Sequence, residues 1–224
     1  MRKRLGTLLL LVAGALAGGR AYASVTDYRF DVLLDEARIG SHAFRVERDR
    51  NGTRQVDIDA AFDVRLLFVP VYSYRHQNVE HWSDGCLVGL VSTTDDNGRA
   101  FAVRARAEND GLRVDAGGTD RALQGCVRSF AYWDRDFLQA ERLLNSQDGA
   151  LVDVDVQGPL YGEFRIGEHR VAGERFRISA ETNLVIDVWY AADGSWLGLK
   201  TEREGRTIRY VPQGAPLHAL HSDA

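Results

Sequence analysis

Histidines and carboxylates gather in two short stretches of this 224-residue chain, and they are its first candidates for chemistry. The stretch RHQNVEH contains His76 and His81, and SFAYWDRD contains Asp134 and Asp136. In a strand, His76 and His81 point to opposite faces. His76 and Glu80 share a face but lie about 13 Å apart along it. Neither pair can chelate one ion alone, so we predict no metal site and no cofactor.

The two aspartates sit where a short helix is expected to begin. Carboxylates at such a position commonly cap the helix and complement its dipole. The sequence contains neither a G-x-S-x-G nucleophile motif nor an H-E-x-x-H motif. We therefore predict a protein that is not an enzyme. Catalysis stays a third hypothesis, with His76, Asp134 and Asp136 as candidates.

Apolar and polar residues alternate along most of the chain, which is typical of strands with one buried face. In DYRFDVLL, residues 27–34, the apolar set falls on every second position. Turn signals such as Asn51-Gly52 and Asp84-Gly85 separate some ten to thirteen such runs. The pattern predicts an all-β fold, a curved antiparallel sheet or half-open barrel, with one short helix within Ser129–Asn145.

Two segments, Glu80–Arg99 and Asp187–Tyr210, repeat one pattern of Trp, Asp-Gly, Gly-Leu and Gly-Arg. We interpret the repeat as hairpin construction, because Asp-Gly supplies the backbone conformation of a tight turn. Gly89 and Gly198 interrupt their strands and predict bulges.

The first 23 residues have the features of a signal peptide: a basic start, a Leu-rich run and AYA before Ser24. We predict cleavage after Ala23, a periplasmic or secreted location, and one domain over 24–224 with a loose tail at 213–224. Cleavage removes four of 28 basic residues and none of 32 acidic ones, giving 24 − 32 = −8. This charge argues against nucleic acid as a partner. We expect no integral membrane segment in the cleaved chain.

The chain has two cysteines, Cys86 and Cys126. In an oxidising compartment such a pair indicates one disulfide. Two buried thiols are the alternative.

Aromatic residues are the remaining candidates for a site. Even spacing places Tyr72, Tyr74, His76 and Trp82 on one face of a strand. We extend the candidate ligand-binding set to Tyr132, Trp133, Trp189 and Trp196. These side chains either fill a core or line an apolar groove on the concave face of the sheet.

Four stretches carry a resemblance to known proteins: RIGSHAFRVER, YSYRHQNVEHWSDGCLVGLVSTTDDNGR, SFAYWD and VIDVWYAADGSWLGLKTEREGRTIRYV. Together they resemble an uncharacterised family of exported bacterial proteins, a domain of unknown function. A looser resemblance, at the level of the fold, is to the periplasmic half-barrel carriers of lipoproteins. That resemblance implies a strongly curved sheet that wraps a helical lid and holds acyl chains. The present chain departs from such carriers in having little helix and a single Met.

The leading functional hypothesis is non-catalytic binding of an apolar or amphipathic ligand, such as a lipid, on the concave face. The alternative is a protein-interaction or assembly factor of the cell envelope that uses a free sheet edge or the aromatic surface.

Overall fold

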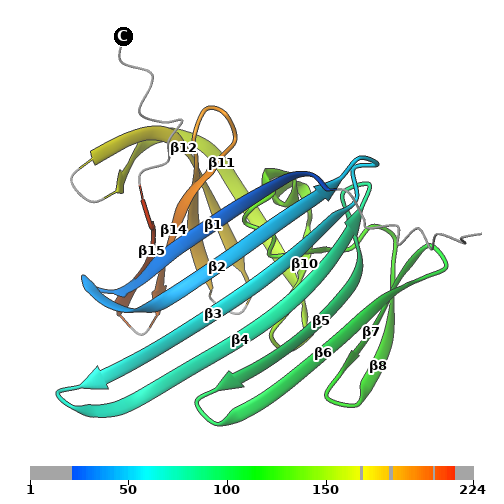
Figure 1. Cartoon of the computed structure of the whole chain (residues 1–224), viewed down its shortest axis with the longest axis horizontal. Coiled ribbons are helices and arrows are strands. Elements are labelled where there is room, and N and C mark those ends of the chain that lie inside the picture. Colours follow the sequence, from blue (N-terminus) through cyan, green and yellow to red (C-terminus); the bar gives the residue numbers. More distant parts are fainter. Residues whose placement is uncertain (1–21, 167–168, 182–183, 204, 215–224) are drawn as a thin grey trace, which may run out of the picture.

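A computed structural model describes residues 22–166, 169–181, 184–203 and 205–214. Within them, one large curved sheet contains fifteen strands and does not close into a barrel (Figure 1). This confirms the predicted fold class. The strands are β1 (Tyr22–Leu34), β2 (Ala37–Asp49), β3 (Arg54–Leu66), β4 (Val69–Ser83), β5 (Cys86–Asp96), β6 (Arg99–Glu108), β7 (Gly111–Ala116), β8 (Thr119–Gln124), β9 (Arg128–Ser129), β10 (Arg142–Leu144), β11 (Leu151–Ile166), β12 (His169–Ala180), β13 (Val185–Tyr190), β14 (Trp196–Arg203) and β15 (Arg206–Pro212).

The sheet consists of two meanders joined where β1 pairs with β15. The strands run in the order β8 to β1 and then β15 to β9, so the first and last strands in the sequence are neighbours in the middle of the sheet. All neighbours are antiparallel except β9 and β10. Figure 1 shows β12, β14 and β15 behind β1 and β2, so the sheet curls back over its own inner face.

Both segments of the repeated sequence pattern form hairpins, as predicted. β4 and β5 are joined by Asp84-Gly85, and β13 and β14 by a longer connection that contains Asp193-Gly194. The register shifts beside Gly89 in the first hairpin and beside Gly198 in the second. At Gly198, φ is +145° and an added Cβ would lie 2.4 Å from the Tyr210 carbonyl oxygen. Both predicted bulges are therefore present.

The predicted helix is shorter than the sequence pattern suggested. It is a five-residue 3₁₀ helix, η1 (Arg135–Gln139), and the Asp134 carboxylate caps it by accepting a hydrogen bond from the Asp136 amide. The residues that follow form β10 instead, which pairs with β9 and β11. Leu143 and Leu144 point to opposite faces of this strand, and both faces are buried.

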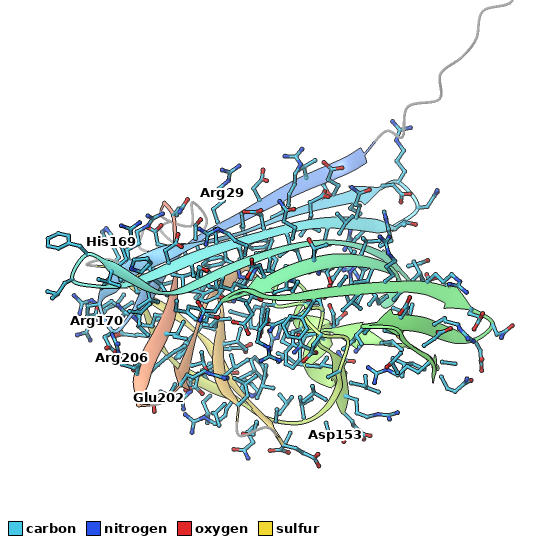
Figure 2. All side chains as sticks on the ribbon, turned by 90° about the horizontal axis from the view of Figure 1, so that it is seen from below. Arg29, Asp153, His169, Arg170, Glu202 and Arg206 are labelled. Atoms are coloured by element: carbon cyan, nitrogen blue, oxygen red, sulfur yellow. A yellow bond between two sulfur atoms is a disulfide. The ribbon has the colours of Figure 1, made fainter. Side chains whose placement is uncertain are left out.

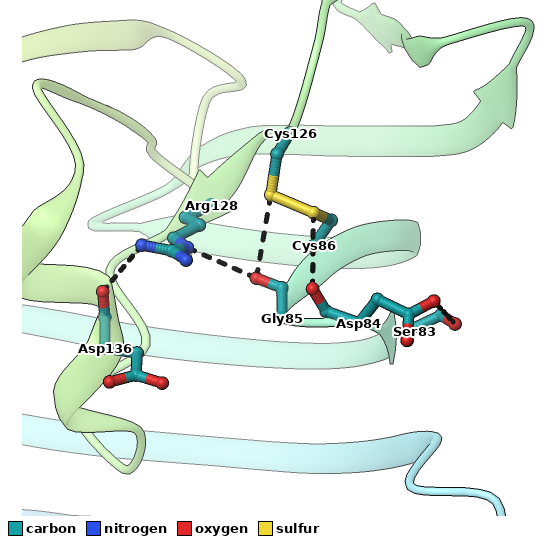
Figure 3. Close-up of a disulfide and its surroundings, with 7 residues drawn as sticks. All are labelled: Ser83, Asp84, Gly85, Cys86, Cys126, Arg128 and Asp136. Carbon is teal, nitrogen blue, oxygen red and sulfur yellow. Dashed lines mark hydrogen bonds between the residues drawn. A yellow bond between two sulfur atoms is a disulfide. The ribbon is translucent and has the colours of Figure 1, made fainter.

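The chain between β8 and β11, residues 126–150, packs against the concave side of the sheet and is called the interior segment below. It contains β9, η1 and β10 and contributes Trp133, Phe137, Leu143 and Leu144 to the main hydrophobic core. The predicted Cys86–Cys126 disulfide ties its start to β5, with the Cα atoms 5.1 Å apart. Figure 3 shows the Arg128 guanidinium beside it, donating to the carbonyl oxygens of Gly85 and Asp136.

A second, smaller cluster lies apart from the main core. Its residues come from β11, β12, β13 and β14, with Phe164 and Trp189 in ring contact at 5.1 Å. The register of β11 against β12 shifts between Gln157 and Leu160, around the cis Gly158–Pro159 bond.

The two ends of the described chain can be compared with the predicted limits of the signal peptide and of the tail. Residues 1–21 of the predicted targeting segment lie outside the described residues, while Tyr22 and Ala23 begin β1. At the other end, the Gln213 amide donates to the Arg29 carbonyl oxygen, and the predicted tail beyond 214 lies outside the described residues. No helix among the described residues is both long and apolar enough to cross a membrane.

Candidate functional site

One end of the curved sheet encloses a cavity of about 800 Å³. It lies between the turn-side halves of β1–β6 and the facing strands β13–β15. Its wall is mainly aliphatic and aromatic: Val32, Leu34, Ile39, Phe62, Val64, Leu184, Ile186, Leu199 and Ile208. Alternation directs these side chains inward from their strands, since residues i and i+2 share a face. The volume is within the range of small-molecule sites in proteins, roughly 300–1,000 Å³.

Three tyrosine hydroxyls interrupt this apolar wall. The Tyr72 hydroxyl donates to Asp96 Oδ1 at 2.8 Å, and that of Tyr74 to Gln147 Oε1 at 3.1 Å. The Tyr210 hydroxyl lies 3.1 Å from His42 Nδ1. Burial raises the pKa of all three phenols, so each stays neutral over the physiological range. The tyrosines add hydrogen-bonding groups to the cavity without adding charge.

Positive charge predominates at the mouth of the cavity. Arg99, Arg203 and Arg206 line it, and Asp96 is the one carboxylate among the described lining residues. Arg206 is paired with Asp35 at 2.6 Å. Arg99 and Arg203 form no ion pair with another described residue, although the Arg99 guanidinium lies 5.2 Å from the Phe101 ring centroid. Figure 2 shows Arg206 and Glu202 at the end of the molecule that the β3–β4 hairpin also reaches.

A smaller cavity of about 190 Å³ lies deeper and shares five lining residues with the first: Tyr74, Tyr132, Gln147, Leu184 and Tyr210. His42 and His76 line this inner cavity. Burial lowers the pKa of His42 to about 3 and that of His76 to about 4. Both imidazoles are therefore neutral at pH 7. Nε2 of His42 is buried and has no hydrogen-bond partner among the described residues.

His76 is also held by hydroxyl groups. Its Nδ1 lies 2.8 Å from Thr94 Oγ1, and its Nε2 lies 3.4 Å from Ser146 Oγ. A serine and a histidine at this separation resemble a nucleophile and its base. However, a pKa of about 4 makes the imidazole a weak acceptor of the serine proton. The pair fits a structural link between β4 and the interior segment.

Glu80 is fully buried near these histidines, also on the inner face of β4. It accepts hydrogen bonds from Asn78 Nδ2 and Trp82 Nε1, both at 2.9 Å. Burial raises its pKa, which the bonds from Asn78, Ser129 and Trp82 only partly oppose. The Glu80 carboxylate is thereby held by hydrogen bonds within the protein, whereas the buried Oδ1 of Asn78 has no hydrogen-bond partner among the described residues.

The structure separates the predicted ligand-binding residues into four places. Tyr72, Tyr74 and Tyr132 line the main cavity, and His76 lines the inner one. Trp82, Trp133 and Trp196 are buried in the core, where the rings of Trp82 and Trp133 meet edge to face at 5.5 Å. Trp189 packs in the second cluster. The predicted common face of Tyr72, Tyr74, His76 and Trp82 is present, but Trp82 lies at its filled end.

The two aspartates singled out for catalysis have structural contacts. Asp134 forms an ion pair with Arg54 at 2.6 Å and caps η1. Asp136 accepts a hydrogen bond from Gln139. Neither lines the cavity that contains His76. Among the residues the structure describes, no group of three or more His, Cys, Asp or Glu side chains could hold a metal ion.

Sequence reasoning missed His42, Tyr210, Arg99 and Arg203. His42 and Tyr210 are 168 residues apart and meet because β1, next to β2, also pairs with β15. Alternation within TIRYV could have placed Tyr210 inward with Ile208. No pattern in the sequence indicated that Arg99 and Arg203, at the ends of two different strands, face one cavity.

Comparison with known proteins gives a family and a fold. A search of curated proteins finds no match. Among solved structures, the chain is similar to a β-barrel-like protein from Brucella abortus that contains a domain of unknown function, DUF1849. The TM-score is 0.61 and the sequence identity 11%, over 84% of this chain and 94% of that one. This likeness shows the fold alone. Residues 30–213 match the domain of unknown function DUF6134, and the chain belongs to that family.

Proposed function

We propose that the protein binds an apolar or amphipathic small molecule of lipid-like chemistry in the 800 Å³ cavity, without catalysing a reaction on it. The proposal rests mainly on this cavity, whose strand walls are mainly apolar and which lies beyond the end of the filled core. Burying the apolar part of a ligand there would release about 25 cal/mol for each Å² removed from water.

The distribution of charge supports an amphipathic ligand with an anionic end. The cavity wall offers neutral tyrosines and aliphatic side chains, and positive charge is concentrated at the mouth. Burying a charge in the apolar wall would be costly, whereas a charged head group at the mouth stays hydrated and can pair with Arg99 or Arg203.

Fluorescence of 1-anilinonaphthalene-8-sulfonate, an apolar dye with one negative charge, tests the cavity directly. Ile208→Trp should fill the cavity from β15 and weaken dye binding at least tenfold. The matched control is Val91→Trp on β5, because Val91 is 48% exposed and does not line the cavity. The control should bind as the wild type does. Equal binding by both variants would place the dye elsewhere and remove the cavity as the site.

Native mass spectrometry of protein isolated gently from its own host tests for a resident ligand. A stoichiometric added mass that is absent after denaturation supports the proposal and identifies the ligand class. A bare mass, together with no dye binding, would favour the second candidate, an envelope assembly factor. That candidate rests on the two sheet edges, β8 and β9, whose outer sides pair with no other described strand.

Export to the periplasm or the cell exterior is part of the proposal. The disulfide supports an oxidising compartment. The register of β1 against β2 shifts between Tyr22 and Ser24, so cleavage after Ala23 would leave the continuous ladder intact. Amino-terminal sequencing of the mature protein should read Ser-Val-Thr-Asp. A start at Met1 would contradict export by this signal.

A further inference from the structure

The turn between β3 and β4 exposes the most prominent apolar side chains among the described residues. Phe68 is 92% exposed and Leu67 87%, with Val69 at 61% and Val71 at 49%. Single exposed apolar residues are ordinary, but a contiguous group marks an interaction site. These four residues are called the apolar tip below.

The composition of this turn departs from the chain's other tight turns. Leu66 pairs with Val69, so Leu67 and Phe68 alone form the turn. Comparable two-residue turns elsewhere are Asp35-Glu36, Asp84-Gly85, Asn97-Gly98, Asn109-Asp110 and Gly117-Gly118.

Leu67 adopts φ of +56°, as Asp84 and Asn97 do at +52° and +53°. Asx and Gly tolerate this region, whereas a branched apolar side chain is disfavoured there. The tip thus keeps apolar residues where both backbone conformation and solvent favour polar ones. Departures of this kind are expected at functional positions.

The tip also lies beside the mouth of the cavity. The hairpin arms that lead to it, β3 and β4, contribute Phe62, Val64 and Tyr72 to the cavity wall. Figure 1 shows the β3–β4 turn extending past the neighbouring β1–β2 and β5–β6 turns. A surface that receives the tip would therefore meet the open end of the cavity.

The charged residues near the apolar tip indicate which kind of surface the tip would contact. Arg65, next to the tip, is exposed and forms no ion pair with another described residue. Arg99 and Arg203 at the mouth add two further positive charges without ion-pair partners among the described residues. Aromatic and aliphatic side chains flanked by arginines are the composition of segments that bury in the interface of an anionic bilayer.

We propose that the apolar tip inserts into the interface of a membrane containing anionic lipid and brings the cavity mouth against it. An apolar ligand then moves between bilayer and cavity without crossing water. The transfer step rests on the proposed function, whereas membrane insertion of the tip can be measured by itself.

Flotation of the mature protein with vesicles of phosphatidylglycerol and phosphatidylcholine tests the insertion. The double variant Leu67→Ser/Phe68→Ser should lower the bound fraction at least tenfold. Val91→Ser, a neutral change of the same kind at an exposed apolar position that does not line the cavity, should change it less than twofold. Dye binding without vesicles should stay at the wild-type level in both variants, showing that the cavity is intact.

A conservative variant provides the second readout. Phe68→Trp should float as the wild type does, and its added fluorescence should be quenched by lipids brominated on the acyl chains. Equal flotation of wild type and double variant, or no additional quenching, would overturn insertion. If the protein floats with vesicles but binds neither the dye nor a resident ligand, the transfer step is contradicted and membrane insertion stands. Failure of the wild type to float, together with tip-dependent cross-linking to an envelope protein, would replace the membrane with a protein partner.

Discussion

The two ends of the curved sheet's inner face are built from the same strands and have opposite character. On β4, Glu80 and Trp82 are completely buried at one end, while Tyr72 and Tyr74 line a cavity at the other. On β3, Val56 is fully buried and Val64 faces the cavity. The strands alternate regularly along their whole length, so alternation alone does not distinguish a filled end from an open one.

The interior segment makes the difference. Residues 126–150 supply the side chains that fill one end, and they are fixed there by the disulfide and by the Arg54–Asp134 ion pair. The Gln147 side chain, which accepts from Tyr74, lines both cavities near the end of this segment. Beyond the end of this segment, no described residues fill the space between β1–β6 and the facing strands β13–β15, and a cavity remains. A curved sheet thus becomes a core or a binding site according to what covers it.

The largest expected effect is at the filled end. Trp82→Ala removes a fully buried ring and its hydrogen bond to Glu80 and should lower the free energy of unfolding by about 3–5 kcal/mol. Urea denaturation measures the change. Tyr72→Phe at the open end is the control and should cost less than about 1.5 kcal/mol, because only one hydroxyl is lost. Equal costs would contradict the difference between the ends.

Removing the covalent link to the interior segment is expected to have the next largest effect. The disulfide spans 40 residues, and Cys86→Ser/Cys126→Ser should cost about 2–4 kcal/mol. Thermal unfolding with and without reductant measures it, and reductant should shift only the wild type. An unchanged double variant would mean that core packing alone holds the segment.

Acidification should lower the free energy of unfolding through His76, which lies on β4 between the filled end and the open end. Burial lowers the pKa of His76 from 6.5 to about 4, so the unfolded chain binds the proton more readily than the folded one. The free energy of unfolding should then fall as pH decreases from about 6.5 to about 4, by at most about 3 kcal/mol for His76. His42 adds to the effect in the same direction.

Glu80 opposes this dependence, because its raised pKa favours the folded state at lower pH. Urea midpoints at several pH values, with a constant m-value, measure the sum. His76→Gln should flatten the profile between pH 6.5 and 4, and Glu80→Gln should steepen it. A His76→Gln profile parallel to the wild type would show that His76 takes a proton equally well in both states.

The smallest expected effect is at the mouth. Arg203→Gln should weaken binding of the anionic dye about two- to fivefold, because an exposed charge pair contributes at most about 1 kcal/mol. Added salt should reduce the difference between wild type and variant. Arg106→Gln, a change at a highly exposed arginine on β6, serves as the control and should bind as the wild type does. Equal losses in both variants would indicate a general charge effect.

By itself, the sequence indicated most of the strands, several tight turns and the two bulges, and it favoured the disulfide over two buried thiols. It predicted ten to thirteen strands where the described residues form fifteen, and it did not predict β9 and β10. The successful predictions follow from interactions between near neighbours or from the presence of only two cysteines: alternation sets the faces, and Asp-Gly or Asn-Gly sets the turns where it occurs. The helix was placed correctly at its Asp134 cap and predicted too long, because the burial of Leu143 and Leu144 depends on the sheet around them.

Only the tertiary structure decided which aromatic side chains face a cavity. Trp82 and Tyr72 share a strand face, but Trp82 packs in the main core with the interior segment and Tyr72 lines the cavity. His42 meets Tyr210, and Arg99 faces the same cavity as Arg203, through the pairing of β1 with β15 and the curl of the sheet. Such contacts link residues far apart in the chain, and they depend on curvature accumulated over many strands. Local pattern specifies a strand's inner face, but the path of the whole chain decides what that face meets.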